Sequence, residues 1–147
     1  MSQVYADFGI EFHYPDEWEV SEERQGEELA ITAYSPQSAF WTVTLIDDRP
    51  DPERVIEAVV AAFEQEYDEI DIYPARDQLC DRPTAGRDID FFCLELLNVA
   101  RARCFRSERF TVLVLYQGTD SELAELEPLF EQISKSLQIV GDVSDAE

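Results

Sequence analysis

Three strand-like runs in the second half of the chain, Gly86–Leu96, Val99–Arg106 and Phe110–Gln117, follow one another almost without a break. The short links lie at Leu97-Asn98 and Ser107-Glu108. A parallel connection would need a dozen or more residues, so these runs are expected to pair as antiparallel hairpins. The last run is apolar on both faces, as is typical of a central strand covered on both sides. The chain is therefore expected to build an antiparallel sheet around this run.

Alternation of apolar and polar residues predicts further extended segments in the first half of the chain. In the first of them apolar side chains occupy every second position, with Glu11 and His13 on the opposite face. Residues 22–28 are expected to form a charged loop, and residues 35–38 a turn between two paired strands. The predicted segments are Phe8–Tyr14, Trp18–Val20, Leu29–Tyr34 and Phe40–Ile46.

Two amphipathic helices are predicted, one before and one after the three hairpin strands. The first has Asp51 as its N-cap and Pro52 at the first helical position, where the missing N–H of proline removes no helical hydrogen bond. The second begins near Thr119, and Glu122 three residues later fits a capping box. Pro128 should either kink this helix or begin a new one.

The order of strands, helix, strands and helix predicts an α+β fold, with a central antiparallel sheet and helices on both of its faces. The length of 147 residues, of which 45% are hydrophobic and 30% charged, suits one globular domain. We expect a single domain over residues 1–139, followed by a disordered acidic tail over residues 140–147.

Acidic residues outnumber basic ones by 33 to 11, so the formal net charge is −22. Nucleic acids and anionic membranes are themselves polyanions, so neither is expected as a direct partner. No apolar run approaches the ~20 residues that a membrane-spanning helix needs. The first residues lack the basic and apolar regions of a secretory signal. The expected location is therefore the cytoplasm.

The residues that usually carry catalysis or bind metal ions are scarce in this sequence. His13 is the only histidine, so neither a catalytic triad nor a histidine-based metal site is expected. The three cysteines have no C-x-x-C spacing, and Cys93 with Cys104 is the one pair that a hairpin could bring together. Nucleotide-binding and hydrolase motifs are absent from the sequence. We therefore expect no enzymatic activity, no cofactor and no dedicated metal site. Whether one of the acidic clusters binds Ca²⁺ is left open by the sequence.

The basic residues are unevenly distributed, since seven of the eleven lie between residues 76 and 109. Arg101 and Arg103 share one face of a predicted strand, and Arg106 lies at its end. One interpretation is that they pair with carboxylates of the preceding strand, namely Asp88, Asp90 and Glu95. The other is a positive spot, where an acidic segment of a partner binds the guanidinium groups. Arg101, Arg103 and Arg106 are therefore the candidate partner-binding residues.

Two short patterns near the ends of the chain point to a known group of proteins. The opening strand carries Phe-x-Tyr-Pro-x-x-Trp, formed by Phe12, Tyr14, Pro15 and Trp18. The closing helix carries Phe-x-x-Ile-x-x-Ser, formed by Phe130, Ile133 and Ser136. Together with the order of elements from about residue 8 to residue 139, these patterns resemble the Mog1/PsbP-like superfamily, which includes the DcrB-type bacterial proteins.

The resemblance implies a three-layer α/β/α sandwich and a non-catalytic role. Mog1-type members bind a small GTPase, PsbP-type members dock on photosystem II, and some bacterial relatives act as chaperones for secreted effectors. Because such different tasks share one scaffold, the fold does not choose among them. No functional residue of the superfamily is carried over to this chain, and the lack of a targeting sequence departs from the PsbP type.

We therefore expect a protein-binding or adaptor module whose partner offers a basic or hydrophobic segment. The negative charge would steer a basic partner toward the chain. A chaperone for a secreted or effector protein is the alternative. The sequence leaves open whether the protein is a monomer or a dimer.

Overall fold

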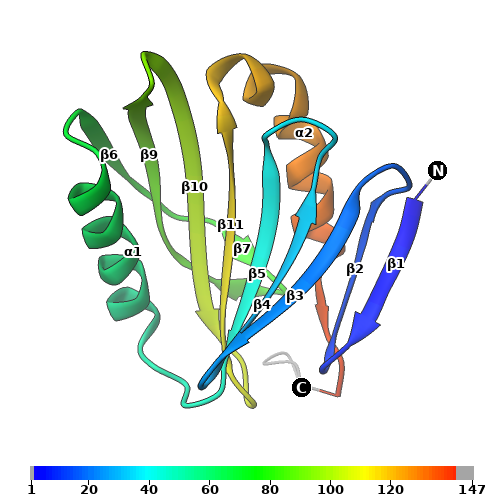
Figure 1. Cartoon of the computed structure of the whole chain (residues 1–147). Coiled ribbons are helices and arrows are strands. Elements are labelled where there is room, and N and C mark those ends of the chain that lie inside the picture. The colour runs from blue at the N-terminus through cyan, green and yellow to red at the C-terminus, as the bar shows by residue number, and fades with distance from the viewer. Residues whose placement is uncertain (1, 142–147) are drawn as a thin grey trace.

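The computed structural model describes residues 2–141, which form an α+β fold built mostly of antiparallel sheet (Figure 1). The main sheet has seven strands, and all neighbours in it run antiparallel. Across the sheet the strands are β3 (Glu19–Gln25), β4 (Glu28–Tyr34), β5 (Phe40–Ile46), β11 (Thr111–Thr119), β10 (Leu96–Arg106), β9 (Ala85–Cys93) and β6 (Ile70–Ala75). The strand predicted to be central, β11, occupies the middle.

The remaining elements are two helices, a small sheet and a short hairpin. The helices are α1 (Pro52–Glu66) and α2 (Asp120–Ser136). The small sheet contains β1 (Ser2–Asp7), β2 (Ile10–Pro15) and β12 (Gln138–Ile139). The short hairpin consists of β7 (Gln78–Leu79) and β8 (Arg82–Pro83).

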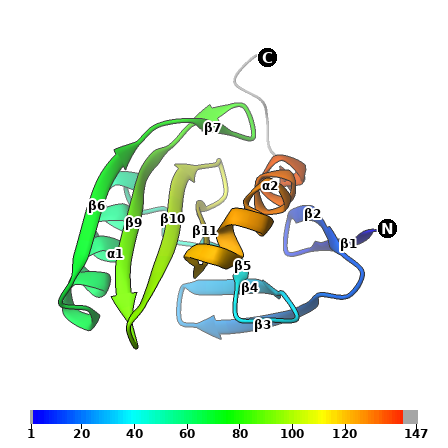
Figure 2. The ribbon, with the colours of Figure 1, turned by 90° about the horizontal axis from the view of Figure 1, so that it is seen from above.

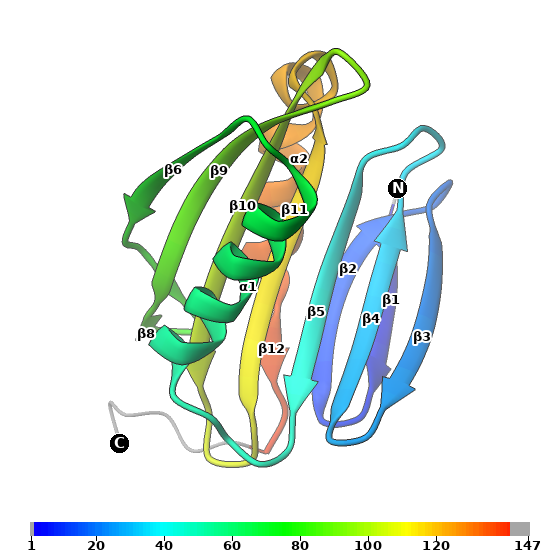
Figure 3. The ribbon, with the colours of Figure 1, turned by 60° about the vertical axis from the view of Figure 1, so that its left-hand side comes forward.

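Helix α1 covers one face of the main sheet, over β9, β10 and β11 (Figure 3). The side chain of Asp51 accepts a hydrogen bond from the backbone N–H of Glu53 at 3.2 Å, which confirms the predicted N-cap. Ile56 is fully buried and packs with Ala102 and Cys104 of β10. The small side chains of Ala102 and Cys104 leave room for α1 to lie against β10.

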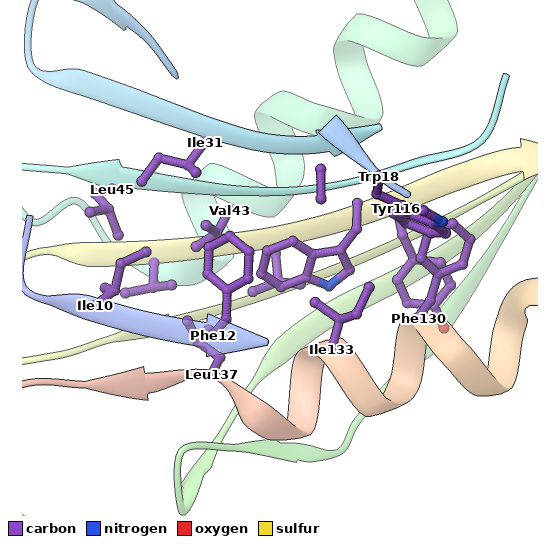
Figure 4. Close-up of a cluster of buried hydrophobic side chains, with 14 of the residues drawn as sticks. Ile10, Phe12, Trp18, Ile31, Val43, Leu45, Tyr116, Phe130, Ile133 and Leu137 are labelled. Atoms are coloured by element: carbon purple, nitrogen blue, oxygen red, sulfur yellow. The ribbon is translucent and has the colours of Figure 1, made fainter. Parts of the chain in front are cut away.

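The opposite face of the main sheet is shared by α2 and the small sheet (Figure 2). The ring of Tyr116 on β11 stacks on Phe130 of α2, with 4.8 Å between the ring centroids (Figure 4). Phe12 of β2 lies 4.8 Å from the ring of Trp41, whose indole N–H donates to Ser134 Oγ at 2.9 Å. A face on which the sequence predicted helices alone is therefore partly covered by strands, because β2 must bury its own apolar side.

Helix α2 begins with the predicted capping box. Thr119 Oγ1 accepts from the N–H of Glu122 at 3.2 Å, and Glu122 Oε1 accepts from the N–H of Thr119 at 2.9 Å. Glu122 Oε2 also accepts from the N–H groups of Ser38 and Ala39, which ties the helix to the β4–β5 turn. Pro128 lies inside α2, so no second helix begins there.

Several predicted boundaries in the first half of the chain are wrong. Residues 22–25 belong to β3 and not to a loop, because β4 supplies their backbone partners at the edge of the sheet while their polar side chains face water. Phe8 lies in the β1–β2 turn with a φ of +52°, outside the strand on which it was expected. The sequence shows no apolar alternation over β1, whose side chains are almost all exposed.

The β9–β10 hairpin turns at Leu94-Glu95 and not at Leu97-Asn98. Burial of the α1-facing side chains fixes the strand register, and this outweighs the turn preference of asparagine. In the observed register Cys93 lies next to the turn, whereas Cys104 lies near the far end of β10. The hairpin therefore does not bring these two cysteines together.

The predicted acidic tail is described only at its beginning. The N–H of Val140 donates a hydrogen bond to the carbonyl of Gly9 at 2.8 Å. Residues 142–147 lie outside the described residues.

Candidate functional site

Arg101 and Arg103 line a cleft of about 470 Å³ between α2, β10, β11 and the residues around β7. Alternation along β10 directs them to the α2 side, because the intervening Ala102 packs against α1. Tyr116 of β11 and Glu127 of α2 form the adjoining walls. The structure thus brings together two of the three predicted arginines.

Each of the two arginines is held by carboxylates from different elements. Arg103 Nε donates to Asp77 Oδ2 at 2.9 Å, and another of its guanidinium nitrogens donates to Asp88 at 2.9 Å. Arg101 Nε donates to Glu127 Oε2 at 2.9 Å, and its guanidinium also lies 3.5 Å from Asp88. The arginines therefore connect the main sheet to α2 and to the segment before β7.

The charges in the cleft neutralise one another. Burial tends to raise the pKa of Glu127, but hydrogen bonds from Arg101 and Tyr116 outweigh it and hold that pKa below its ordinary value of 4.5. Burial also tends to lower the pKa of both arginines, but their carboxylate partners raise it. The lining contains three bases, Arg101, Arg103 and Lys135, and four acids, Asp77, Asp88, Glu127 and Glu131. The cleft is thus close to neutral.

Arg106 lies apart from the other two candidates, at the opposite end of β10 from the hairpin turn. With Arg49 and Arg82 it lines a second hollow of about 290 Å³. Two guanidinium nitrogens of Arg49 donate to the carbonyl of Ser107, at 3.0 and 2.8 Å. The three predicted arginines therefore do not form one site.

The tip of the β9–β10 hairpin exposes apolar side chains that no sequence motif indicated. Leu94 is 92% exposed, Leu96 57% and Phe92 48%. We define these three residues, with Glu95 between them, as the hairpin tip. The signal was present in the sequence as Phe91-Phe92-Cys93-Leu94-Glu95-Leu96-Leu97, but alternation placed most of it within the predicted strand Gly86–Leu96.

The backbone of the hairpin tip is strained as well as exposed. Leu94 and Glu95 have φ values of +53° and +66°. A two-residue hairpin turn of this kind needs positive φ at both positions, which Asn-Gly supplies most easily. For ordinary residues this region costs about 1–2 kcal/mol each. The protein thus keeps a leucine and a glutamate at positions where neither backbone geometry nor packing favours them.

His13 and Cys104 were the other residues that the sequence offered for metal binding or disulfide formation. His13 is exposed, and its backbone N–H donates to Ser136 Oγ at 2.9 Å. Burial raises the pKa of the Cys104 thiol to about 12. No group of three or more metal-binding side chains gathers within residues 2–141, and no helix there is long and apolar enough to cross a membrane.

Comparison with protein-family models gives no match, and no curated protein is similar in sequence. Solved structures do resemble this one. CyanoP, the PsbP protein of Synechocystis, is 13% identical with a TM-score of 0.57, and the match covers 94% of this chain and 92% of that chain. LpqN of Mycobacterium tuberculosis is 13% identical with a TM-score of 0.55, covering 95% and 91%. The chain has a Mog1/PsbP-like fold.

A third structure, a protein of unknown function from Pseudomonas aeruginosa, is 11% identical with a TM-score of 0.56, covering 92% of this chain and 94% of that chain. The TM-scores and coverages show a shared fold, and at 11–13% identity they show no activity. LpqN is involved in cell envelope biogenesis, whereas CyanoP is a PsbP protein, so the neighbours do not share one described task. A function for this chain has to be argued from its own surface.

Proposed function

We propose that this protein is a non-catalytic protein-binding or adaptor module, and that the hairpin tip is its contact surface. The observation that carries the proposal is the exposure of Leu94 and Leu96 at the hairpin turn, with Phe92 exposed on the other face of the same hairpin. Scattered apolar residues are normal on a protein surface, but a contiguous exposed group marks an interaction site. Burying such side chains against a partner is favourable at roughly 25 cal/mol per Å² of apolar surface.

The strain in the turn supports the same proposal. Strained backbone persists where the surrounding structure enforces it, and it concentrates at functional sites. A leucine that is 92% exposed gains no packing in the free protein. Binding a partner would give Leu94 the packing that its own fold does not.

The non-catalytic part of the proposal is supported by the ion pairs of the cleft. A general acid working near neutral pH needs a pKa close to that pH, usually raised for a carboxyl group. The pKa of Glu127 is shifted the other way, because Arg101 and Tyr116 stabilise its charged form. We assign Arg101 and Arg103 a supporting role in partner binding, through the positions of α2 and β7, and Arg106 a secondary contact at its exposed hollow.

The proposed location is the cytoplasm. Cys93 and Cys104 form no disulfide bond within residues 2–141, as is usual for proteins of a reducing compartment. Fractionation of cells that carry the tagged protein would test this, and recovery outside the cytoplasm would contradict it.

A chaperone for a secreted or effector protein is the second candidate, because an exposed apolar tip could also hold an unfolded client. The two functions differ in the bound protein. An adaptor binds a folded partner at fixed stoichiometry, whereas a chaperone binds its client unfolded and releases it on folding. Limited proteolysis of the bound protein, which is fast for an unfolded client, separates them.

Affinity purification of the tagged full chain, at low and high salt, tests the proposal. We expect a stoichiometric partner with the wild type and its loss with the double variant Leu94→Ser/Leu96→Ser. Val140→Ser is the control, because Val140 is 52% exposed and follows β12, which belongs to the small sheet and not to the β9–β10 hairpin. Equal recovery of the partner by the tip variant and the wild type would contradict the proposal.

A further inference from the structure

Among residues 2–141, the segments at the end of the molecule that carries the hairpin tip contain acidic residues and no Lys or Arg. The tip, the α1–β6 connection and the start of α2 lie together at this end (Figures 1 and 3). The N–H of Phe92 donates to the carbonyl of Glu69 at 3.1 Å, which joins the first two of these segments. No Lys or Arg occurs in residues 55–75, 88–100 or 110–134, which include all three segments.

Two acidic residues, Glu95 and Glu69, adjoin the hairpin tip through the backbone. Glu95 stands in the turn between Leu94 and Leu96, and Glu69 lies beside Phe92. Both glutamates are exposed, and neither takes part in an ion pair with another residue of the described range. The nearest arginines along β10, Arg101 and Arg103, are occupied by carboxylates of the cleft. The hairpin tip thus consists of exposed apolar side chains next to two negative charges that no nearby cation neutralises.

We infer that the hairpin tip binds a polypeptide segment in which apolar residues are flanked by Lys or Arg. This rests on the proposed function and names the chemistry of the partner. The apolar side chains of the segment would cover Leu94 and Leu96, while its cations face Glu95 and Glu69. Complementary charge raises the association rate and sets the orientation of binding, and buried apolar area holds the complex.

The same charges disfavour the other occupants of an exposed apolar tip. An anionic membrane surface would be repelled by the acids around the tip, as would a nucleic acid. A second copy of this chain, docked tip to tip, would bring the Glu95 side chains of the two copies together without a cation between them. Like charges opposed at an interface weaken binding and suppress the wrong partner. A cationic segment meets no such penalty.

Fluorescence anisotropy with three labelled twelve-residue peptides and the full chain tests the inference. The first peptide has a central Leu-rich group flanked by lysines, the second has glutamates in place of the lysines, and the third has serines in place of the leucines. We expect the first to bind at least tenfold more tightly than either of the others. Leu94→Ser/Leu96→Ser should weaken its binding about tenfold, and Glu69→Gln/Glu95→Gln several-fold.

Glu23→Gln/Glu28→Gln is the matched control, because it removes the same charge from two exposed residues of the β3–β4 hairpin. Binding of the lysine peptide should be unchanged in this variant. An equal loss in both charge variants would mean attraction to the net charge alone, and would overturn the inference. Equal binding of the lysine and glutamate peptides would overturn it as well. In either case a tip-dependent partner in the purification experiment would leave the proposed function standing.

Discussion

The turn of the β9–β10 hairpin links stability to binding in a way that one double variant can test. In Leu94→Asn/Glu95→Gly, the residues of the preferred two-residue hairpin turn replace those of the protein. The native residues have φ values of +53° and +66°. Leu94 is 92% exposed, so its truncation removes little packing. The variant should therefore be more stable and bind its partner less well.

The expected gain follows from the two backbone positions. An ordinary residue in the left-handed region costs about 1–2 kcal/mol. Glycine at position 95 removes that strain but loses about 0.5–1 kcal/mol through the extra freedom of the unfolded chain. Asparagine at position 94 relieves part of the strain, because it tolerates this region better than leucine. Together the changes should stabilise the protein by about 1–2 kcal/mol.

Urea unfolding followed by tryptophan fluorescence measures this gain, since Trp18 and Trp41 are 6% and 0% exposed in the folded protein. With a slope of about 2 kcal/mol per M, the midpoint should rise by roughly 0.5–1 M at an unchanged slope. Anisotropy with the lysine peptide measures binding in the same samples. A lower midpoint would refute the account of turn strain. A higher midpoint with unchanged binding would show that the tip is not the contact surface.

Three further predictions concern the cleft and the core. Gly86→Ala should lower the thermal midpoint, because the added Cβ would lie 2.8 Å from Arg103 Cδ. Overpacking of this kind costs about 1–3 kcal/mol. An unchanged midpoint would contradict the close approach. Glu127→Gln should flatten the dependence of stability on pH. The pKa of the native carboxylate lies below its ordinary value of 4.5. The contribution of Glu127 to the free energy of unfolding is therefore present above pH 4.5 and is lost as the pH falls through the lowered native pKa. Urea unfolding at pH 7 and pH 3.5 measures this, and identical losses in wild type and variant would oppose it. Cys104, with its pKa raised to about 12 by burial, should resist iodoacetamide at pH 8 until the protein is unfolded, as followed by mass spectrometry.

Much of the local structure could be predicted because its signals lie within a few residues of each other. The N-cap at Asp51 and the capping box of Thr119 and Glu122 depend on contacts two or three residues along the chain. The central position of β11 follows from its two apolar faces. By contrast, β1 and most of β3 show no apolar alternation, so only pairing with a neighbouring strand identifies them.

The candidate site was less predictable, because each side chain's role depends on residues far away in the sequence. Asp88 was expected as a partner of the arginines, and it pairs with both Arg101 and Arg103. Glu127 and Asp77, which lie 26 residues from their respective arginines, gave no sequence signal of pairing. Their positions depend on where α2 and the segment before β7 settle on the sheet.

The sequence by itself determined the antiparallel pairing, the two helices, the apolar faces and the large negative charge, because these depend on short connections, periodicity and composition. The tertiary structure alone decided which charges are neutralised and which apolar residues stay exposed. The reason is that strand register and helix docking are chosen by the packing of the whole core. A shift of the β9–β10 turn by three residues moves a predicted strand segment, Leu94–Leu96, to an exposed tip.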